Sequence, residues 1–271
     1  MEHIEELVRS RRSVRAYEER ELSAANLEKL SSFMAGIENP YGIPVEFKLL
    51  DGNERELKCP VVTGTKLFVG AKIPRVPHME EAFGYSFEML VLYAWSLGIG
   101  TVWVGGTMDR PAFERAMELK PEERMPCMSP LGYPAKKMSL RESMMRKGIK
   151  ADSRENFEAL FFDGGFDTPL TEEKAGRLAG PLELVRRAPS AVNKQPWRVV
   201  ADKDAVHFYL KRSKGFISEA AGDLQKVDLG IALCHFALAA EENGVNVCFD
   251  MSDPGISTGT NLEYIASYRL G

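Results

Sequence analysis

The sequence has few of the residues that build metal centres. It contains four cysteines and four histidines in 271 residues, and these residues do not recur at the short spacings that are typical of zinc ligands. The cysteines are Cys59, Cys127, Cys234 and Cys248, and the histidines are His3, His78, His207 and His235. We therefore expect reduced thiols and no metal.

The chain also lacks an excess of positive charge and a long apolar run. Its formal net charge is −4, whereas non-specific binding of nucleic acid needs a concentrated positive field. No window approaches the roughly 18 apolar residues that span a bilayer, and the first residues lack the basic start and apolar run of a secretory signal. These absences predict a cytoplasmic protein that acts on small molecules, without a nucleic-acid or membrane partner.

Several catalytic motifs are missing as well. The sequence has no Rossmann fingerprint, Walker A loop, Gly-x-Ser-x-Gly elbow or His-Glu-x-x-His pair, so nothing favours a kinase, a hydrolase or a metalloprotease. What is present is the composition of a folded protein, with 44% hydrophobic and 27% charged residues. The length suits one large domain or two of ordinary size.

Apolar spacing predicts helices and strands that follow a similar order in the two halves of the chain. In the first half we expect helices over 4–8 and 23–36, strands over 45–50 and 66–70, a long apolar helix over 79–97 and a strand over 101–104. In the second half we expect a helix over 182–187, a strand over 198–201, a long apolar helix over 228–242 and a strand over 245–249.

This recurrence suggests a degenerate internal duplication. Gly98 and Gly244 follow the two long helices and lie 146 positions apart, and the earlier units align at an offset of about 150 to 155. Chance similarity of helix–turn–strand units is the alternative explanation. The stretch 133–181 is too apolar for a flexible linker, so we expect a structured crossover between two halves, residues 1–150 and 151–271.

Two short segments carry the most chemical information. Residues 10–17 read Ser-Arg-Arg-Ser-Val-Arg-Ala-Tyr, and residues 188–197 read Ala-Pro-Ser-Ala-Val-Asn-Lys-Gln-Pro-Trp. Guanidinium groups match phosphate oxygens with two parallel hydrogen bonds, and a serine hydroxyl adds another donor. On these residues alone, the first segment is also consistent with a solvated basic loop, and Trp197 with a residue of the core.

The two segments resemble motifs of the nitroreductase family of FMN-dependent oxidoreductases. The resemblance implies an α+β fold in which helices wrap a mixed or antiparallel sheet. It assigns Arg11 and Ser13 to the FMN phosphate and ribityl chain, with Arg12 in the same binding segment. It places Arg15 near the N1/O2 edge of the flavin ring, where a fixed cation stabilises the charge of the reduced form. The cofactor contacts implied for the second segment are Pro189, Ser190, Ala191, Asn193 and Gln195.

Two further segments resemble the same family. Residues 98–106 read Gly-Ile-Gly-Thr-Val-Trp-Val-Gly-Gly, and the resemblance places the backbone of Gly105 and Gly106 beside the flavin ring; for the first two glycines a plain helix stop is the alternative. Residues 131–135 read Leu-Gly-Tyr-Pro-Ala, and in the family a basic residue after Gly-Tyr-Pro reaches the phosphate. The candidates are Lys136, Lys137 and Arg141, and a solvent-facing position is the alternative for each.

The family motifs are divided between the two halves. The first half reads Gly-Ile-Glu-Asn-Pro-Tyr over 36–41, where Ala-Pro-Ser-x-x-Asn is expected, and the second half has no Arg-Arg-Ser start. We therefore expect an internally duplicated pseudo-dimer with one flavin site, built by both halves of one chain. The fusion favours a monomer and leaves higher oligomers open.

The activity that the resemblance implies is an NAD(P)H-dependent FMN oxidoreductase. In the expected ping-pong cycle, hydride passes from NAD(P)H to flavin N5 and then to a nitroaromatic, a quinone or a similar small acceptor. The flavin carries this chemistry, so no protein acid or base is required. The alternatives are a flavin-binding or flavin-sequestering protein without turnover, and a cofactor-free structural relic.

Overall fold

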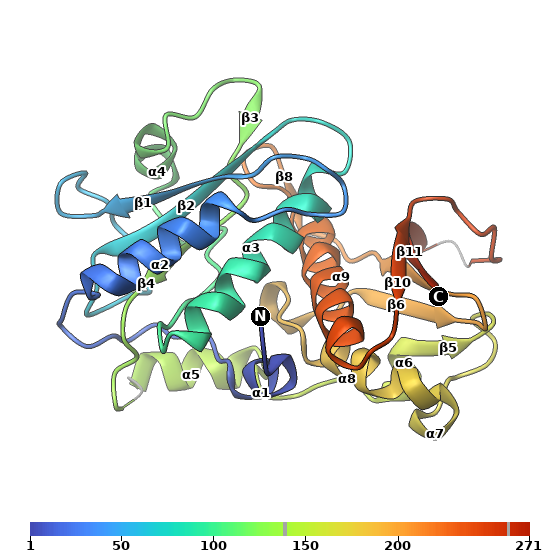
Figure 1. Cartoon of the computed structure of the whole chain (residues 1–271). Coiled ribbons are helices and arrows are strands. Elements are labelled where there is room, and N and C mark those ends of the chain that lie inside the picture. The colour runs from blue at the N-terminus through green and yellow to red at the C-terminus, as the bar shows by residue number, and fades with distance from the viewer. Residues whose placement is uncertain (138–139, 259–260) are drawn as a thin grey trace.

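Two β-sheets, one from each half of the chain, form the framework of the protein (Figure 1). The computed structural model describes residues 1–137, 140–258 and 261–271, and of residues 140–142 the backbone alone. In the first sheet, β2 (Leu67–Pro74) pairs antiparallel with β1 (Glu46–Asp51), β3 (Glu123–Arg124) and β4 (Met128–Leu131). This sheet therefore lies wholly within the first half.

The second sheet is mixed and comes wholly from the second half. Its strand order is β10 (Val247–Asp250), β11 (Leu262–Leu270), β7 (Ala205–Lys211), β6 (Trp197–Ala201) and β5 (Phe161–Asp163). The pair β5 and β6 is parallel, and the other pairs are antiparallel. A small antiparallel pair, β8 (Ile217–Ser218) with β9 (Gly222–Asp223), precedes the last long helix. The α+β class with mixed and antiparallel sheets is confirmed.

Two long helices, α3 (Met79–Ser96) and α9 (Leu224–Glu242), pack against each other between the sheets (Figure 1). Across the described part of the chain, no helix combines the length and the apolar character that a membrane crossing requires. The shorter helices are α1 (Ile4–Ser10), α2 (Ala24–Ala35), α4 (Arg110–Ala116), α5 (Leu140–Gly148), α6 (Phe157–Leu160), α7 (Glu172–Ala175) and α8 (Ala179–Arg187), with 3₁₀ turns at Gly176–Leu178 and Ala191–Asn193.

The crossing of α3 and α9 depends on one glycine from each helix. A Cβ on Gly84 would lie 2.1 Å from the carbonyl oxygen of Val227, and a Cβ on Gly230 would lie 2.0 Å from that of Glu81. Gly84 and Gly230 are 146 positions apart, and so are Glu81 and Val227. The two contacts are thus the same contact with the partners exchanged, which is the arrangement found around a two-fold axis.

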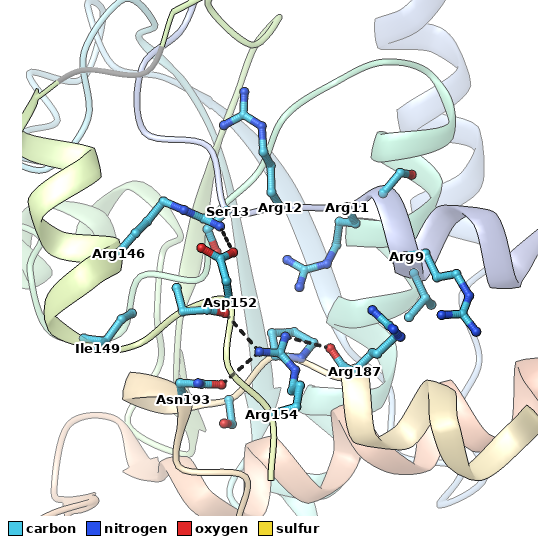
Figure 2. Close-up of a pocket in the computed structure, with 15 residues that line it drawn as sticks. Arg9, Arg11, Arg12, Ser13, Arg146, Ile149, Asp152, Arg154, Arg187 and Asn193 are labelled. Atoms are coloured by element: carbon cyan, nitrogen blue, oxygen red, sulfur yellow. Dashed lines mark hydrogen bonds and ion pairs between the residues drawn. The ribbon is translucent and has the colours of Figure 1, made fainter. Parts of the chain in front are cut away.

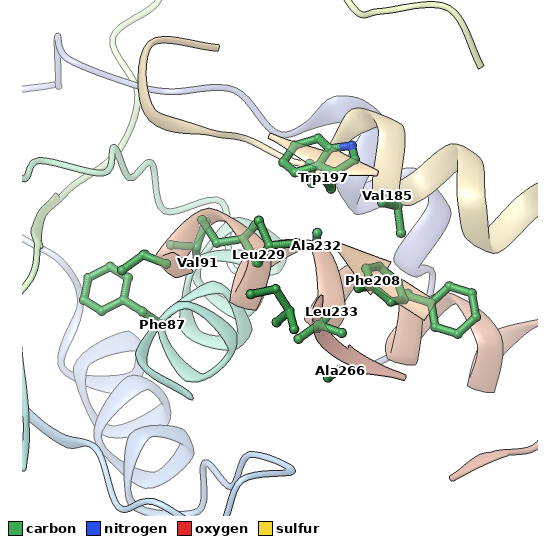
Figure 3. Packing of buried hydrophobic residues seen from close by; sticks show 14 of the residues in the cluster. Phe87, Val91, Val185, Trp197, Phe208, Leu229, Ala232, Leu233 and Ala266 are labelled. Atoms are coloured by element: carbon green, nitrogen blue, oxygen red, sulfur yellow. The ribbon is translucent and has the colours of Figure 1, made fainter. Parts of the chain in front are cut away.

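A continuous apolar core joins the two halves (Figure 3). Phe87 and Val91 from α3 contribute to the same cluster as Leu233 from α9 and Phe208 from β7. Trp197 is fully buried in this cluster, as expected for a core residue. Since burying one large apolar side chain contributes about 1.5–3 kcal/mol, this shared core ties the halves together strongly.

Local signals explain most of the helix boundaries, and one predicted strand is wrong. The Ser23 side chain accepts from the Asn26 N–H and starts α2, and Asp223 starts α9 four residues earlier than predicted. Residues 101–104 form no strand, because residues 100–104 make only isolated bridges, to Ser13 in the N-terminal segment and to Met128 and Gly132 at the two ends of the β4 segment. The described residues of the crossover over 133–181 include α5, α6, β5 and α7.

Candidate functional site

A cavity of about 350 Å³ brings the two singled-out segments together (Figure 2). Its walls come from α1 and the residues after it, from the end of α5 and the stretch that follows, and from the residues after α8. The predicted site residues that line it are Arg11, Arg12, Ser13, Pro189, Ser190 and Asn193. Segments about 175 residues apart in sequence thus meet in one site.

The cavity is strongly basic. Its carboxylate Asp152 forms an ion pair with Arg146, and Glu183 behind the wall accepts from Arg187 at 2.7 Å. The arginines that line it are Arg9, Arg11, Arg12, Arg146, Arg154 and Arg187. Clustered cations between low-dielectric walls concentrate anions, so the cavity is suited to a negatively charged ligand.

Arg11 enters the cavity directly after α1 ends. Its backbone N–H donates to the Leu7 carbonyl and closes the helix, and the chain then becomes extended so that Val14 N–H donates to Thr101 O at 2.8 Å. The Arg11 Nε is buried without a hydrogen-bond partner. Burial lowers the pKa of Arg11, and the charge of Arg146 lowers it further, against the effect of Glu88.

Arg154 reaches the same cavity from the stretch between α5 and α6. Its Nη1 donates to Ser153 O at 2.8 Å and to Asn193 Oδ1 at 3.3 Å, and its Nη2 donates to Arg187 O at 3.0 Å. Its Nε is buried without a partner. Burial, followed by the nearby charges of Arg11 and Arg187, lowers the pKa of Arg154 to about 10, so it remains charged at neutral pH.

The polar residues of the 188–197 segment bond mainly to the protein itself. The Ser190 Oγ accepts from the Gln195 N–H at 2.8 Å, and the Gln195 Oε1 accepts from the Glu155 N–H at 2.9 Å. The Asn193 amide donates to Lys150 O at 2.8 Å and to Ser153 O at 3.0 Å. These bonds hold the stretch that carries Arg154 against the segment.

Asp228 holds the 188–197 segment against α9. Its buried carboxylate, in the second turn of α9, accepts from the Ala191 N–H at 3.0 Å. Burial raises the pKa of Asp228 well above its usual range, although the Ala191 N–H opposes that rise and the charge of Asp223 adds to it. Ala191 thus contributes to the site through its backbone, which faces α9.

A buried polar network lies between the two long helices. Glu88 Oε1 is 3.0 Å from His235 Nε2, and Glu88 Oε2 accepts from Trp103 Nε1 at 3.0 Å. The Nδ1 of His235 is 2.9 Å from Leu184 O. Because a carbonyl only accepts, His235 carries a proton on Nδ1. The network ties α3, α8 and α9 together and contributes the negative charge felt by Arg11.

The remaining predicted site residues do not line this cavity. Arg15 is held by its backbone, whose carbonyl accepts from Thr63 N–H at 2.9 Å, and Gly105 O accepts from Arg110 Nη2 at 2.6 Å. Lys136 and Lys137 are exposed, and the Arg141 side chain lies outside the described residues. Also absent from the lining are Gly106, Ala191 and Gln195. The ring contacts implied for Arg15, Gly105 and Gly106 stay predictions.

Sequence reasoning missed four arginines of the cavity, namely Arg9, Arg146, Arg154 and Arg187. Arg146 and Arg154 belong to a basic stretch that is recognisable only as part of the crossover, and Arg187 directly precedes the Ala-Pro-Ser motif. Among the described basic residues of the crossover after Gly-Tyr-Pro, Arg146 and Arg154 line the cavity, and both lie further along the chain than Lys136 and Lys137. The available signal was the density of arginines flanking both motifs.

The arrangement of two sheets around a pair of long helices is the nitroreductase fold. It matches the crystal structure of a "putative nitroreductase" from Thermotoga maritima with a TM-score of 0.60 and 19% sequence identity, over 98% of this chain and 92% of that one. A family model described as "Putative TM nitroreductase" matches residues 3–240. The chain therefore belongs to this nitroreductase family.

Shorter structures match about half of the chain. An FMN-dependent nitroreductase from Clostridium difficile is 16% identical with a TM-score of 0.42, over 49% of this chain and 88% of that one. A nitroreductase family protein from Clostridium novyi is 15% identical with a TM-score of 0.43, over 49% and 86%. No curated protein sequence matches the chain.

Proposed function

We propose that the protein is an FMN-dependent oxidoreductase that uses NAD(P)H to reduce a nitroaromatic, a quinone or a similar small acceptor in a ping-pong cycle. The observation that carries the proposal is the pair of buried guanidinium Nε atoms, on Arg11 and Arg154, that lack partners beside the basic cavity. A phosphate dianion supplies such partners through short, charge-assisted hydrogen bonds. Membership of the nitroreductase family supports FMN as the source of that phosphate.

The residues present fit the phosphate end of FMN. Arg11, Ser13 and Arg154 would hold the phosphate, and the cavity of about 350 Å³ is within the usual range of ligand sites. When bound, FMN supplies a ring that accepts hydride from one substrate and returns it to another. In this proposal Arg15 would be a fixed cation that favours the reduced ring, and the backbone of Gly105 and Gly106 would lie beside the ring.

One flavin site per chain is part of the proposal. The exchanged contacts of Gly84 and Gly230 support an internal pseudo-dimer of residues 1–150 and 151–271. A second cavity, of about 540 Å³, lies where residues 38–40 meet residues 245–247, and its charged lining residues are Glu38 and Glu241. These carboxylates would repel a phosphate. We place the activity in a cytoplasmic monomer that needs no macromolecular partner.

The test is a spectrum of the purified protein under anaerobic conditions. We expect bound flavin close to one per chain, bleaching on addition of NADH or NADPH, and recolouring when a quinone or a nitroaromatic is added. A bound flavin that stays oxidised would favour flavin binding without turnover. A colourless protein that takes up no added FMN would contradict the proposal, and a stoichiometry near two would contradict the single site.

A further inference from the structure

We propose that Glu242 is a positioning residue for ligand binding in the basic cavity, and that it acts by holding α1 against the C-terminal end of α9. The same helix holds the 188–197 segment through Asp228. One helix thus sets the spacing between two walls of the cavity that come from different halves of the chain. The inference rests on the proposed function only in naming FMN as the ligand.

The helix α1 is capped by a residue from the other half of the chain. His3, at the usual capping position, has a left-handed backbone with a φ of 58° and makes no side-chain cap bond. Instead, Glu242 Oε1 accepts from the Ile4 N–H at 2.7 Å, and Glu242 Oε2 accepts from the Glu5 N–H at 3.0 Å. Two of the first N–H groups of α1, which have no partner within a helix, are therefore bonded to the end of α9.

Glu242 is an unfavourable residue for the end of its own helix. It is the last residue of α9, it follows Glu241, and the last turn holds no basic residue. The C-terminal end of a helix carries partial negative charge, which repels a carboxylate, whereas the N-terminal end of α1 attracts one. The contact with α1 therefore accounts for a carboxylate at this position, and α9 alone does not. Without that contact, Glu242→Ala would leave the melting temperature level or raise it.

The helix α1 leads directly into the cavity wall, and Figure 1 shows it near the C-terminal end of α9. Ile4 and Val8 are buried in a cluster that includes residues of α8 and α9, and the lining of the cavity begins at Val8 and continues to Ser13. The helix has seven residues, fewer than an isolated helix needs to be stable in water. The place of this wall therefore depends on what holds α1 to the rest of the molecule.

The two carboxylates that hold the walls belong to α9 and not to α3. Asp228 and Glu242 are separated by nearly four turns, so their side chains leave the same side of the helix, about 21 Å apart along its axis. The offset of 146 positions between the crossing glycines relates Asp228 to Ala82 and Glu242 to Ser96. Ala82 has no polar side chain, and the Ser96 hydroxyl donates to a carbonyl of its own helix. This asymmetry matches the position of the basic cavity, whose walls α9 holds.

Hydrogen exchange of the ligand-free protein tests the contact itself. In Glu242→Ala, the amides of residues 7–11, which are bonded within α1, should exchange about 10-fold faster than in the wild type, because the helix has lost its cap. Thr171→Ala is the matched control, since it removes the side-chain cap of another short helix, α7, and should leave these amides unchanged. Exchange at the wild-type rate in Glu242→Ala would overturn the inference.

FMN titration of folded variants tests the positioning role. Glu242→Ala should weaken FMN binding about 3–10-fold, because the N-terminal wall is in place in a smaller fraction of the molecules. Charge alone predicts the opposite sign, since removing a carboxylate strengthens the attraction for an anion. Glu242→Gln keeps one acceptor oxygen and should recover part of the affinity, and Thr171→Ala should bind like the wild type. Wild-type or higher affinity in Glu242→Ala, or an equal loss in Thr171→Ala, would overturn the role.

A cap within α1 separates the contact with α9 from simple capping. Adding His3→Ser to Glu242→Ala supplies a capping hydroxyl, so the exchange rates should recover while FMN binding stays weak. Full recovery of FMN affinity would overturn the role of α9.

Inorganic phosphate separates this inference from the proposed function. A wild type that binds no FMN would contradict the proposed function alone. Phosphate should raise the melting temperature of the flavin-free wild type more than that of Glu242→Ala, and this difference would still support the positioning role. An equal rise in the two proteins, or none in either, would overturn it.

Discussion

Replacing either glycine at the crossing of α3 and α9 with alanine should destabilise the protein. The new Cβ would lie 2.0–2.1 Å from a backbone carbonyl oxygen, about 1 Å closer than such atoms approach. Because a backbone oxygen cannot rotate away, the helices must separate. Overpacking of this kind costs about 1–3 kcal/mol, and we expect the upper end. Alanine returns about 1 kcal/mol of helix propensity, so the net loss is about 2 kcal/mol.

Thermal and urea unfolding measure this loss. About 2 kcal/mol corresponds to a fall of roughly 4–8 °C in melting temperature for a chain of this size. The control is Gly180→Ala in α8, where the nearest atom to the new Cβ is Asn243 Oδ1 at 3.4 Å, so its stability should stay level or rise. Gly84→Ala with Gly230→Ala should cost less than the sum, because one separation relieves both contacts. If each single variant is as stable as the wild type, the close approach of α3 and α9 at these glycines is refuted.

Three further changes test a buried carboxylate of α3 and the strain and anchoring of the 188–197 segment. Burial raises the pKa of Glu81 from 4.5 to about 7, so the free energy of unfolding falls as pH rises through this range. Relative to the wild type, Glu81→Gln should therefore be up to about 3 kcal/mol more stable at pH 8 and equally stable at pH 4. Urea unfolding of the two proteins with parallel pH profiles would contradict this. Val192 is 54% exposed and has a φ of 44°. Val192→Asn should stabilise the protein by about 1 kcal/mol, because asparagine tolerates that conformation. A lower melting temperature for this variant than for the wild type would argue against strain. Asp228→Asn keeps an acceptor for the Ala191 N–H and should retain FMN affinity, whereas Asp228→Ala should have a lower FMN affinity. Equal FMN affinities of the two variants would show that Asp228 does not anchor the segment.

Elements with strong local signals could be predicted from the sequence. The long helices α3 and α9 follow from continuous apolar stretches closed by Gly98 and Asn243-Gly244, and the start of α2 follows from its Ser23 cap. The prediction of a strand over 101–104 failed because its apolar residues are buried between two segments, around Ser13 and over 128–132, that only the tertiary fold brings near. Local pattern alone carries no information about such partners.

The site residues that belong to family motifs could be predicted from the sequence. Those that are distinguished only by their burial could not. Arg11, Ser13 and Ser190 could be assigned to one cavity because both motifs belong to one family pattern, and the cavity does bring them together. Arg154 had no such signal, since an arginine in a basic crossover is usually solvated. What distinguishes Arg154 is a buried Nε and the carbonyl oxygens around its other donors, both of which arise only on folding.

The position of Arg154 also bears on why a duplicated chain would keep a single site. Arg146 and Arg154 lie on the connection between the halves, and a fused chain has one such connection. If the halves are duplicates, only one of their two related cavities can receive these arginines. The cavity beside residues 38–40 lies away from that connection and has Glu38 and Glu241 in its lining. Under the proposed single site, a weaker affinity of that cavity for anions would follow from the topology of the fusion, because the connection and its arginines reach only the other cavity.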